Sequence, residues 1–150
     1  MTGSGVTQAA LFSCFLIMAS VWDIRKREIP DTLSAFVFCT GLLSFTPDKL
    51  AGILLGLPLL IAALGKKGGM GGGDIKFAAA AGFVLGLPVG TAGLVFGLSA
   101  AILYHLAICA IRRFNNMKLP AASQTSLPLA PFLSAGFITA YFMNYGGLFL

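Results

Sequence analysis

Six apolar stretches separated by short polar connections are the feature that most constrains how this chain of 150 residues can fold. The clearest is residues 91–111, a run of 21 residues without Asp, Glu, Lys or Arg. At about 1.5 Å per residue, a helix of this length crosses a hydrocarbon layer of about 30 Å. The other five stretches cover residues 6–22, 32–45, 50–64, 74–88 and 128–145. The pattern predicts an all-α membrane protein, a polytopic bundle of about six transmembrane helices.

The composition also indicates a membrane protein. Apolar residues make up 57% of the chain and charged residues 10%, with a mean hydropathy of +0.91. A water-soluble domain of this size has too much surface for its volume to bury so many apolar side chains. Some stretches are shorter than the usual span of about 20 residues, which local bilayer thinning or shelter by neighbouring helices accommodates. We expect residues 1–150 to form a single transmembrane domain.

The basic residues predict an orientation. Nine of the ten Lys and Arg residues lie in or beside the first, third and fifth connections, and Lys49 is the exception. The positive-inside rule assigns these connections to the cytoplasm, so both termini are expected outside. The net charge of +5 is divided into short clusters between apolar stretches. This distribution is typical of membrane orientation and gives no support to a nucleic-acid partner.

Two of the five acidic residues carry the functional hypothesis. Asp23 ends the first apolar stretch, and Asp74 closes the glycine run that begins at Gly71. Carboxylates next to lipid are costly and therefore usually functional, and the predicted topology places this pair at one cytoplasmic surface. Two neighbouring carboxylates share a proton, so one can activate a water while the other donates a hydrogen bond to a scissile carbonyl. Asp23 and Asp74 are therefore the predicted catalytic pair of an aspartyl protease, which requires neither metal nor cofactor.

Structural roles remain open for each acidic residue. Asp23 is able to pair with Arg25 or Arg27. Asp74 is placed to cap the fourth helix at its N-terminus. Asp31 follows Ile-Pro and precedes an apolar run, so a structural N-cap of the second helix is favoured there.

The residues around Asp74 are candidates for shaping the site. Gly71, Gly72 and Gly73 adopt backbone conformations closed to other residues, and they allow close approach to a substrate or to the other aspartate. A flexible loop that includes residues 68–70 is the alternative. Lys76 either reaches to the membrane interface or helps to hold the aspartate pair.

The three cysteines predict no metal centre or disulfide. Cys14, Cys39 and Cys109 all lie inside apolar stretches and form no CxxC pattern. We expect them to be small buried apolar residues.

Three motifs in order resemble those of the type IV prepilin peptidases, which are GxGD-type membrane aspartyl proteases. They are Asp23-Ile-Arg-Lys-Arg-Glu-Ile-Pro-Asp31, Gly71-Gly-Gly-Asp-Ile-Lys76 and Leu127-Pro-Leu-Ala-Pro-Phe-Leu133. The resemblance implies that Asp23 and Asp74 are catalytic. The last motif is similar to a PFxPF segment but has Leu129 in place of its first Phe, and no catalytic residue is assigned there.

The resemblance implies an endopeptidase of the bacterial inner membrane. Its expected substrates are prepilins or pseudopilins, whose basic leader is cut from an apolar helix at the cytoplasmic surface. Long members of the family carry an N-terminal segment with paired cysteines that is linked to N-methylation. This chain has no such cysteine pair, so we expect a short form with peptidase activity alone.

Two other function classes are weighed against this prediction. A small proton- or ion-coupled transporter needs acidic residues near the bilayer midplane, whereas these lie at the ends of apolar stretches. A non-catalytic membrane partner in pilus assembly does not need both aspartates.

Overall fold

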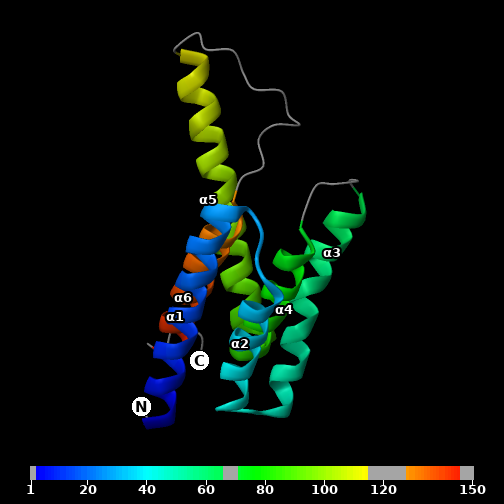
Figure 1. Ribbon diagram of the computed structural model, residues 1–150, viewed down its shortest axis with the longest axis vertical. Helices are drawn as coiled ribbons and strands as arrows, with labels where there is room; N and C mark the ends of the chain where they lie inside the picture. Colours follow the sequence, from blue (N-terminus) through cyan, green and yellow to red (C-terminus); the bar gives the residue numbers. More distant parts are fainter. Residues whose placement is uncertain (1–2, 66–70, 115–127, 146–150) are drawn as a thin grey trace.

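The computed structural model describes residues 3–65, 71–114 and 128–145. All of the regular elements in these ranges are helical, as predicted (Figure 1). In chain order they are α1 (Gly3–Lys26), α2 (Asp31–Leu42), the 3₁₀ helix η1 (Pro47–Leu55), α3 (Gly56–Gly65), α4 (Gly72–Leu85), α5 (Leu87–Phe114) and α6 (Ala130–Tyr145). Each predicted apolar stretch corresponds to one helix, and the third corresponds to η1 and α3 together.

Three helical segments in the described part of the chain are long and apolar enough to cross a membrane. They are Gly5–Lys26, Pro47–Gly65 and Leu87–Arg113. The helix α2 is apolar but contains only 12 residues, and α4 and α6 contain 14 and 16. Membrane-like helices are therefore confirmed, while a total of about six spans stays a prediction.

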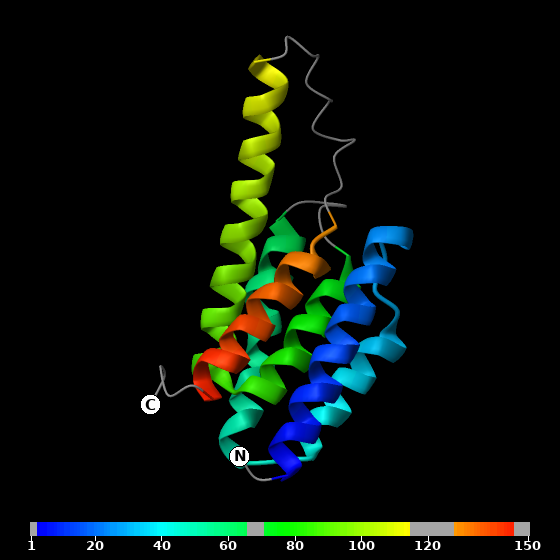
Figure 2. The same cartoon turned by 90° about the vertical axis from the view of Figure 1, so that its left-hand side faces the viewer.

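Successive helices run in alternating directions, except that α3 continues in the direction of η1 (Figure 1). As a result, the end of α1 and the start of α4 lie toward one end of the bundle, and the start of α1 and the end of α6 lie toward the other (Figure 2). The C-terminal half of α5 projects beyond the other helices at the first end (Figure 2). The helix ends that flank the three basic connections thus lie toward one end of the bundle, while their orientation in the membrane stays a prediction.

The helix α4 is the centre of the bundle. It contacts α2, η1, α3, α5 and α6, and a run of its side chains from Phe77 onward is almost entirely buried. Where α4 crosses η1, a Cβ on Gly82 would overlap the backbone of Gly52. In lipid, small residues at crossings allow helix backbones to pack closely, so these two glycines let α4 take its central place.

The link between α4 and α5 is a single residue, Gly86, with a φ of +78°. This left-handed conformation strains residues that carry a side chain, and glycine adopts it freely. The sequence prediction ended the fourth stretch near Pro88 and began the fifth at Thr91. That boundary was wrong because Pro88 lies in the first turn of α5, where its missing N–H costs no hydrogen bond.

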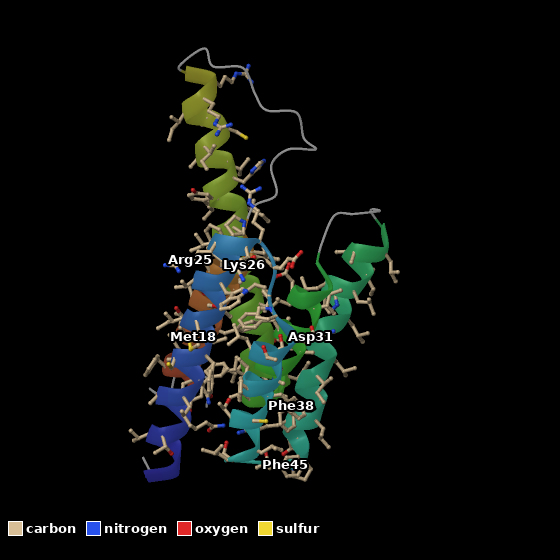
Figure 3. All side chains as sticks on the ribbon, viewed as in Figure 1. Met18, Arg25, Lys26, Asp31, Phe38 and Phe45 are labelled. Atoms are coloured by element: carbon tan, nitrogen blue, oxygen red, sulfur yellow. The ribbon has the colours of Figure 1, made fainter. Side chains whose placement is uncertain are left out.

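The outer surface of the bundle is apolar. Met18 and Phe45 are exposed along it, and Arg25 and Lys26 mark the end of α1 (Figure 3). Apolar side chains on the outside are expected where the surroundings are lipid.

The cysteines correct one prediction. All three are free thiols, but Cys14 and Cys39 are exposed on this outer surface and Cys109 is half-buried. They are not the fully buried residues expected, because helices surrounded by lipid can place apolar side chains on the outside as well as in the core.

A polar network joins α1, α2 and η1 at the end of the bundle near the N-terminus. Gln8 is 1% exposed, and its Nε2 donates to the Thr40 carbonyl at 3.0 Å. Ser44 Oγ donates to Gln8 Oε1 at 2.7 Å, and Lys49 Nζ donates to the Ser44 carbonyl at 2.8 Å. The exceptional basic residue Lys49 therefore has a structural role within the described bundle.

Candidate active site

Asp23 lies in the last turn of α1 and is only 5% exposed. Its Oδ2 accepts a hydrogen bond of 2.9 Å from the backbone N–H of Ala130, the first residue of α6. The first N–H groups of a helix have no partner within it, and its N-terminus carries a partial positive charge. Asp23 therefore caps α6 from another helix and lies where a negative charge is favoured.

Arg27 directly follows Lys26, the last residue of α1. Its φ is +55°, and its N–H donates to the Asp23 carbonyl at 2.7 Å. Positive φ is uncommon outside glycine, and here it turns the chain from α1 into the segment that leads to Ile29 and Pro30. This turn brings the chain back toward α4.

The register between α1 and α6 fixes the position of Asp23. Further along the same pair of helices, Ser134 Oγ donates to the Leu16 carbonyl at 3.1 Å, and the Tyr141 hydroxyl lies 3.5 Å from the Gly5 carbonyl. These contacts run antiparallel from one end of the bundle to the other, so the carboxylate of Asp23 is held by the packing of two whole helices.

Asp74 is the third residue of α4 and is half-buried. Its N–H donates to the Gly71 carbonyl at 3.2 Å. The N-cap residue of α4 is Gly71, and no side chain makes a capping hydrogen bond there. The capping role considered for Asp74 was therefore wrong, and its carboxylate instead lies in the first turn, where the helix dipole favours negative charge.

The structure brings the two aspartates within electrostatic range. Asp74 lies outside the three candidate spans. Burial, and secondarily the negative charge of Asp23, raise the pKa of Asp74 from its ordinary value of 3.8 to about 6. Desolvation and a like charge both disfavour the ionised form of a carboxyl. The two predicted catalytic residues thus belong to one electrostatic site built from α1 and α4.

Gly73 allows the two segments to meet. A Cβ on Gly73 would lie 2.8 Å from the Ile29 carbonyl oxygen and 3.1 Å from the Ile29 Cβ. A Cβ on Gly72 would meet nothing within 4 Å, and one on Gly71 would lie 3.9 Å from Asp74 Oδ2. Of these three glycines, only Gly73 is required for a close approach. Residues 68–70, which the flexible-loop interpretation includes, lie outside the described residues.

Lys76 lies apart from the aspartate pair. Its Nζ donates to Asp31 Oδ2 at 2.6 Å, and this ion pair joins the first turns of α2 and α4. The N-cap of α2 is Pro30, and Asp31 is the first helical residue without a side-chain capping bond. The capping prediction for Asp31 was therefore wrong, since its carboxylate pairs with a lysine from the neighbouring helix.

Sequence reasoning missed the contribution of the third motif. It assigned no role to Ala130, whose backbone N–H binds Asp23. The available signal was the placement of prolines at positions 128 and 131 around a helix start, because such a start presents N–H groups without helical partners. Within the described residues, no group of three or more His, Cys, Asp or Glu side chains gathers as a metal-binding cluster.

The fold and the site define a helical membrane protein in which two aspartates from different helices share one end of the bundle. The chain belongs to the type IV leader peptidase family, whose family model matches residues 10–112. It is 34% identical over 141 residues to the prepilin leader peptidase/N-methyltransferase of Bacillus subtilis (strain 168), with 89% of this chain aligned. The chain spans 54% of that relative's length. No solved structure was found to match it.

Proposed function

We propose that this chain is an aspartic endopeptidase that removes the basic leader peptide of type IV prepilins or pseudopilins. The observation that supports this best is the electrostatic site formed by Asp23 and Asp74 in a member of the leader peptidase family. We place the reaction at the cytoplasmic surface of the bacterial inner membrane, because the helix ends that flank the basic connections lie toward the same end as the aspartates. The proposal concerns peptide hydrolysis alone.

The proposed mechanism assigns different protonation states to the two carboxyls. Asp74 is the member of the pair that takes up the shared proton, since its pKa is raised to about 6. Asp23, whose Oδ2 accepts the Ala130 N–H, is the base that takes a proton from the attacking water. Asp74 donates its proton to the scissile carbonyl as the tetrahedral intermediate forms. The pair titrates as a unit, so the roles describe the reacting state.

The neighbouring glycines and the lysine have proposed supporting roles. Gly73 brings the start of α4 against Ile29 and so places Asp74 near Asp23. Gly71 and Gly72 leave space beside the start of α4 for an extended substrate backbone. Lys76 contributes only an exposed ion pair with Asp31, between the first turns of α2 and α4.

The location of the site fits a substrate with a polar leader and an apolar helix. Asp23 and Asp74 lie at helix ends, where the boundary between leader and helix reaches the same depth as the carboxylates. An ion-coupled transporter would instead place such groups near the middle of its spans.

The direct test is cleavage of a prepilin in membranes by wild type, Asp23→Asn and Asp74→Asn. Both variants are expected to insert and fold but to lose cleavage by at least about 1000-fold, because each lacks one member of the acid–base pair. Glu28→Gln is the matched control, since it removes an exposed carboxylate from the turn after α1 and is expected to retain activity. Near-normal cleavage by either folded Asp variant would refute the catalytic assignment.

A further inference from the structure

A cavity of about 330 Å³ lies between α2, η1 and α4, away from the aspartate pair. From α4 it is lined by Lys76, Ala79 and Ala80, which follow one another at helical spacing on a single face. Asp74 precedes Lys76 by two residues and therefore lies about 200° around the helix axis. The cavity is thus on the opposite side of α4 from the candidate active site.

Along α2 the cavity lining changes from charged to polar to apolar. Asp31, Ser34 and Phe38 line it at positions i, i+3 and i+7, so they follow one another down one face of the helix. Ser34 lies about 4.5 Å, and Phe38 about 10.5 Å, farther along the helix axis than Asp31. The charged end faces the basic end of the bundle, and the apolar end lies toward the bundle's middle.

The Ser34 hydroxyl, in the polar part of this lining, has no hydrogen-bond partner in the described protein. Ser34 is 5% exposed, and its Oγ makes no hydrogen bond in the described structure. Buried polar groups nearly always have a partner, so this hydroxyl, in a residue that lines the cavity, has a hydrogen bond left to donate to a ligand.

The charged part of the lining places one positive and one negative side chain, Lys76 and Asp31, at the mouth of the cavity. Lys76 Nζ and Asp31 Oδ2 lie 2.6 Å apart, and their side chains are 58% and 68% exposed. An exposed ion pair contributes little stability by itself, so its members can be separated by a ligand that supplies a partner for each. The deeper walls, formed by Phe38, Ile53 and alanines, present no charge.

We propose that this cavity binds a glycerophospholipid with a primary-amine headgroup from the leaflet at that end. The ammonium binds Asp31, the phosphate binds Lys76, an ester carbonyl accepts a hydrogen bond from Ser34, and an acyl chain lies against Phe38 and Ile53. The charged, hydroxyl and apolar layers follow the order of headgroup, ester and chain in such a lipid. An apolar protein helix matches less well, since its backbone carbonyls are already hydrogen-bonded and it brings no paired charges.

The test uses the whole chain, purified in detergent and titrated with phosphatidylethanolamine, phosphatidylcholine or phosphatidylglycerol of the same acyl chains. Bound lipid is counted by native mass spectrometry. Phosphatidylethanolamine is expected to bind at least about fivefold more tightly than the other two. A quaternary choline has no N–H to donate to Asp31, and a glycerol headgroup has no positive charge for it.

Two tryptophan variants localise the binding. Ala35→Trp fills the cavity from the exposed face of α2 and is expected to weaken phosphatidylethanolamine binding at least about tenfold. Ala62→Trp adds the same side chain to an exposed position of α3 away from the cavity and is expected to bind like wild type. A photoreactive group on the acyl chain is expected to label peptides that contain Phe38 or Ile53.

Ser34→Ala separates the lipid contact from folding. Binding is expected to fall about threefold to tenfold, the size of one lost hydrogen bond. Without lipid the variant is expected to be as thermostable as wild type, because the hydroxyl has no protein partner to lose. Equal phosphatidylethanolamine binding by wild type and Ala35→Trp would overturn the proposal. Protection of Phe38 and Ile53 by a synthetic prepilin helix but by no phospholipid would also overturn it and assign the cavity to a protein helix.

Discussion

Asp74 is a residue of the candidate site that lowers the stability of the folded protein at neutral pH. Burial and the charge of Asp23 raise its pKa from 3.8 to about 6. The folded protein therefore binds this proton more tightly than the unfolded chain does. The resulting stabilisation is fully present below about pH 3.8 and is lost as the pH rises through about 6. At neutral pH the ionised carboxylate thus opposes folding.

Asp74→Asn is expected to remove this cost while abolishing activity. At pH 7.5 the variant should unfold a few degrees higher than wild type, given that about 1 kcal/mol corresponds to roughly 2–4 °C in a chain of this size. At pH 4 the two proteins should unfold at similar temperatures, because wild-type Asp74 is then mostly protonated. Thermal unfolding in detergent across this pH range measures the difference. A pH dependence that is unchanged by the substitution would assign it to other groups.

Gly73 and Gly72 offer a matched pair of substitutions in the first turn of α4. Alanine normally stabilises a helix relative to glycine by up to about 1 kcal/mol. Gly72→Ala is expected to be neutral or stabilising, because its Cβ meets nothing within 4 Å. Gly73→Ala would press on the Ile29 backbone and move α4 away from α1, with an expected loss of prepilin cleavage of at least about tenfold.

Both the rate of prepilin cleavage and the thermal stability are measured for the two alanine variants. Equal cleavage by the two alanine variants would show that the Gly73–Ile29 contact does not position Asp74. A Gly73→Ala protein that folds but cleaves slowly would support positioning.

At the scale of elements, one hydrogen bond between α1 and α6 joins the Asp23 carboxylate to the backbone N–H of Ala130. Asn in place of Asp23 keeps an oxygen that can accept from Ala130, whereas Ala leaves that buried N–H unpaired. We expect Asp23→Asn to retain most of the stability and Asp23→Ala to lose about 1–3 kcal/mol. Both are expected to be inactive.

Denaturant or thermal unfolding of the two Asp23 variants distinguishes the structural role from the catalytic one. If the Ala variant were as stable as the Asn variant, the hydrogen bond to Ala130 would contribute nothing to the stability of the folded protein.

The elements also show what the sequence can predict. The number and type of the helices follow from their apolar runs, which depend only on local composition. The boundary at Pro88 was wrong because a proline that ends one helix and one that begins the next look alike until Gly86 is known to make the turn. The caps expected of Asp31 and Asp74 failed because their positions relative to the helix start depend on tertiary packing.

The candidate site was predictable in its charged residues and not in its supporting contacts. Asp23 and Asp74 stand out because carboxylates are rare beside apolar stretches. The contacts of Ala130 with Asp23 and of Gly73 with Ile29 each use a backbone group, and backbone groups are chemically the same at every position. The prolines around residue 130 indicate a helix start, but only the three-dimensional arrangement identifies the partner of its N–H group.

At the scale of the whole molecule, the alternation of helices links topology to function. The start of α1 and the end of α6 lie toward the end opposite the aspartates (Figure 1). A C-terminal alkaline phosphatase fusion, which is active only outside the cytoplasm, is therefore expected to be active. A fluorescent protein inserted in the connection between α3 and α4 is expected to fluoresce, because it folds in the cytoplasm.

The orientation decides whether the proposed substrate can reach the site. A prepilin presents its basic leader to the cytoplasm, so the aspartates must lie at that face for the leader boundary to meet them. The opposite fusion pattern would place Asp23 and Asp74 outside the cell membrane, and leader removal at the cytoplasmic surface would then be impossible even if both carboxylates proved essential. Topology is thus an independent test of the function, because the positive-inside charge distribution and the aspartate pair are separate features of the sequence that must agree on one face.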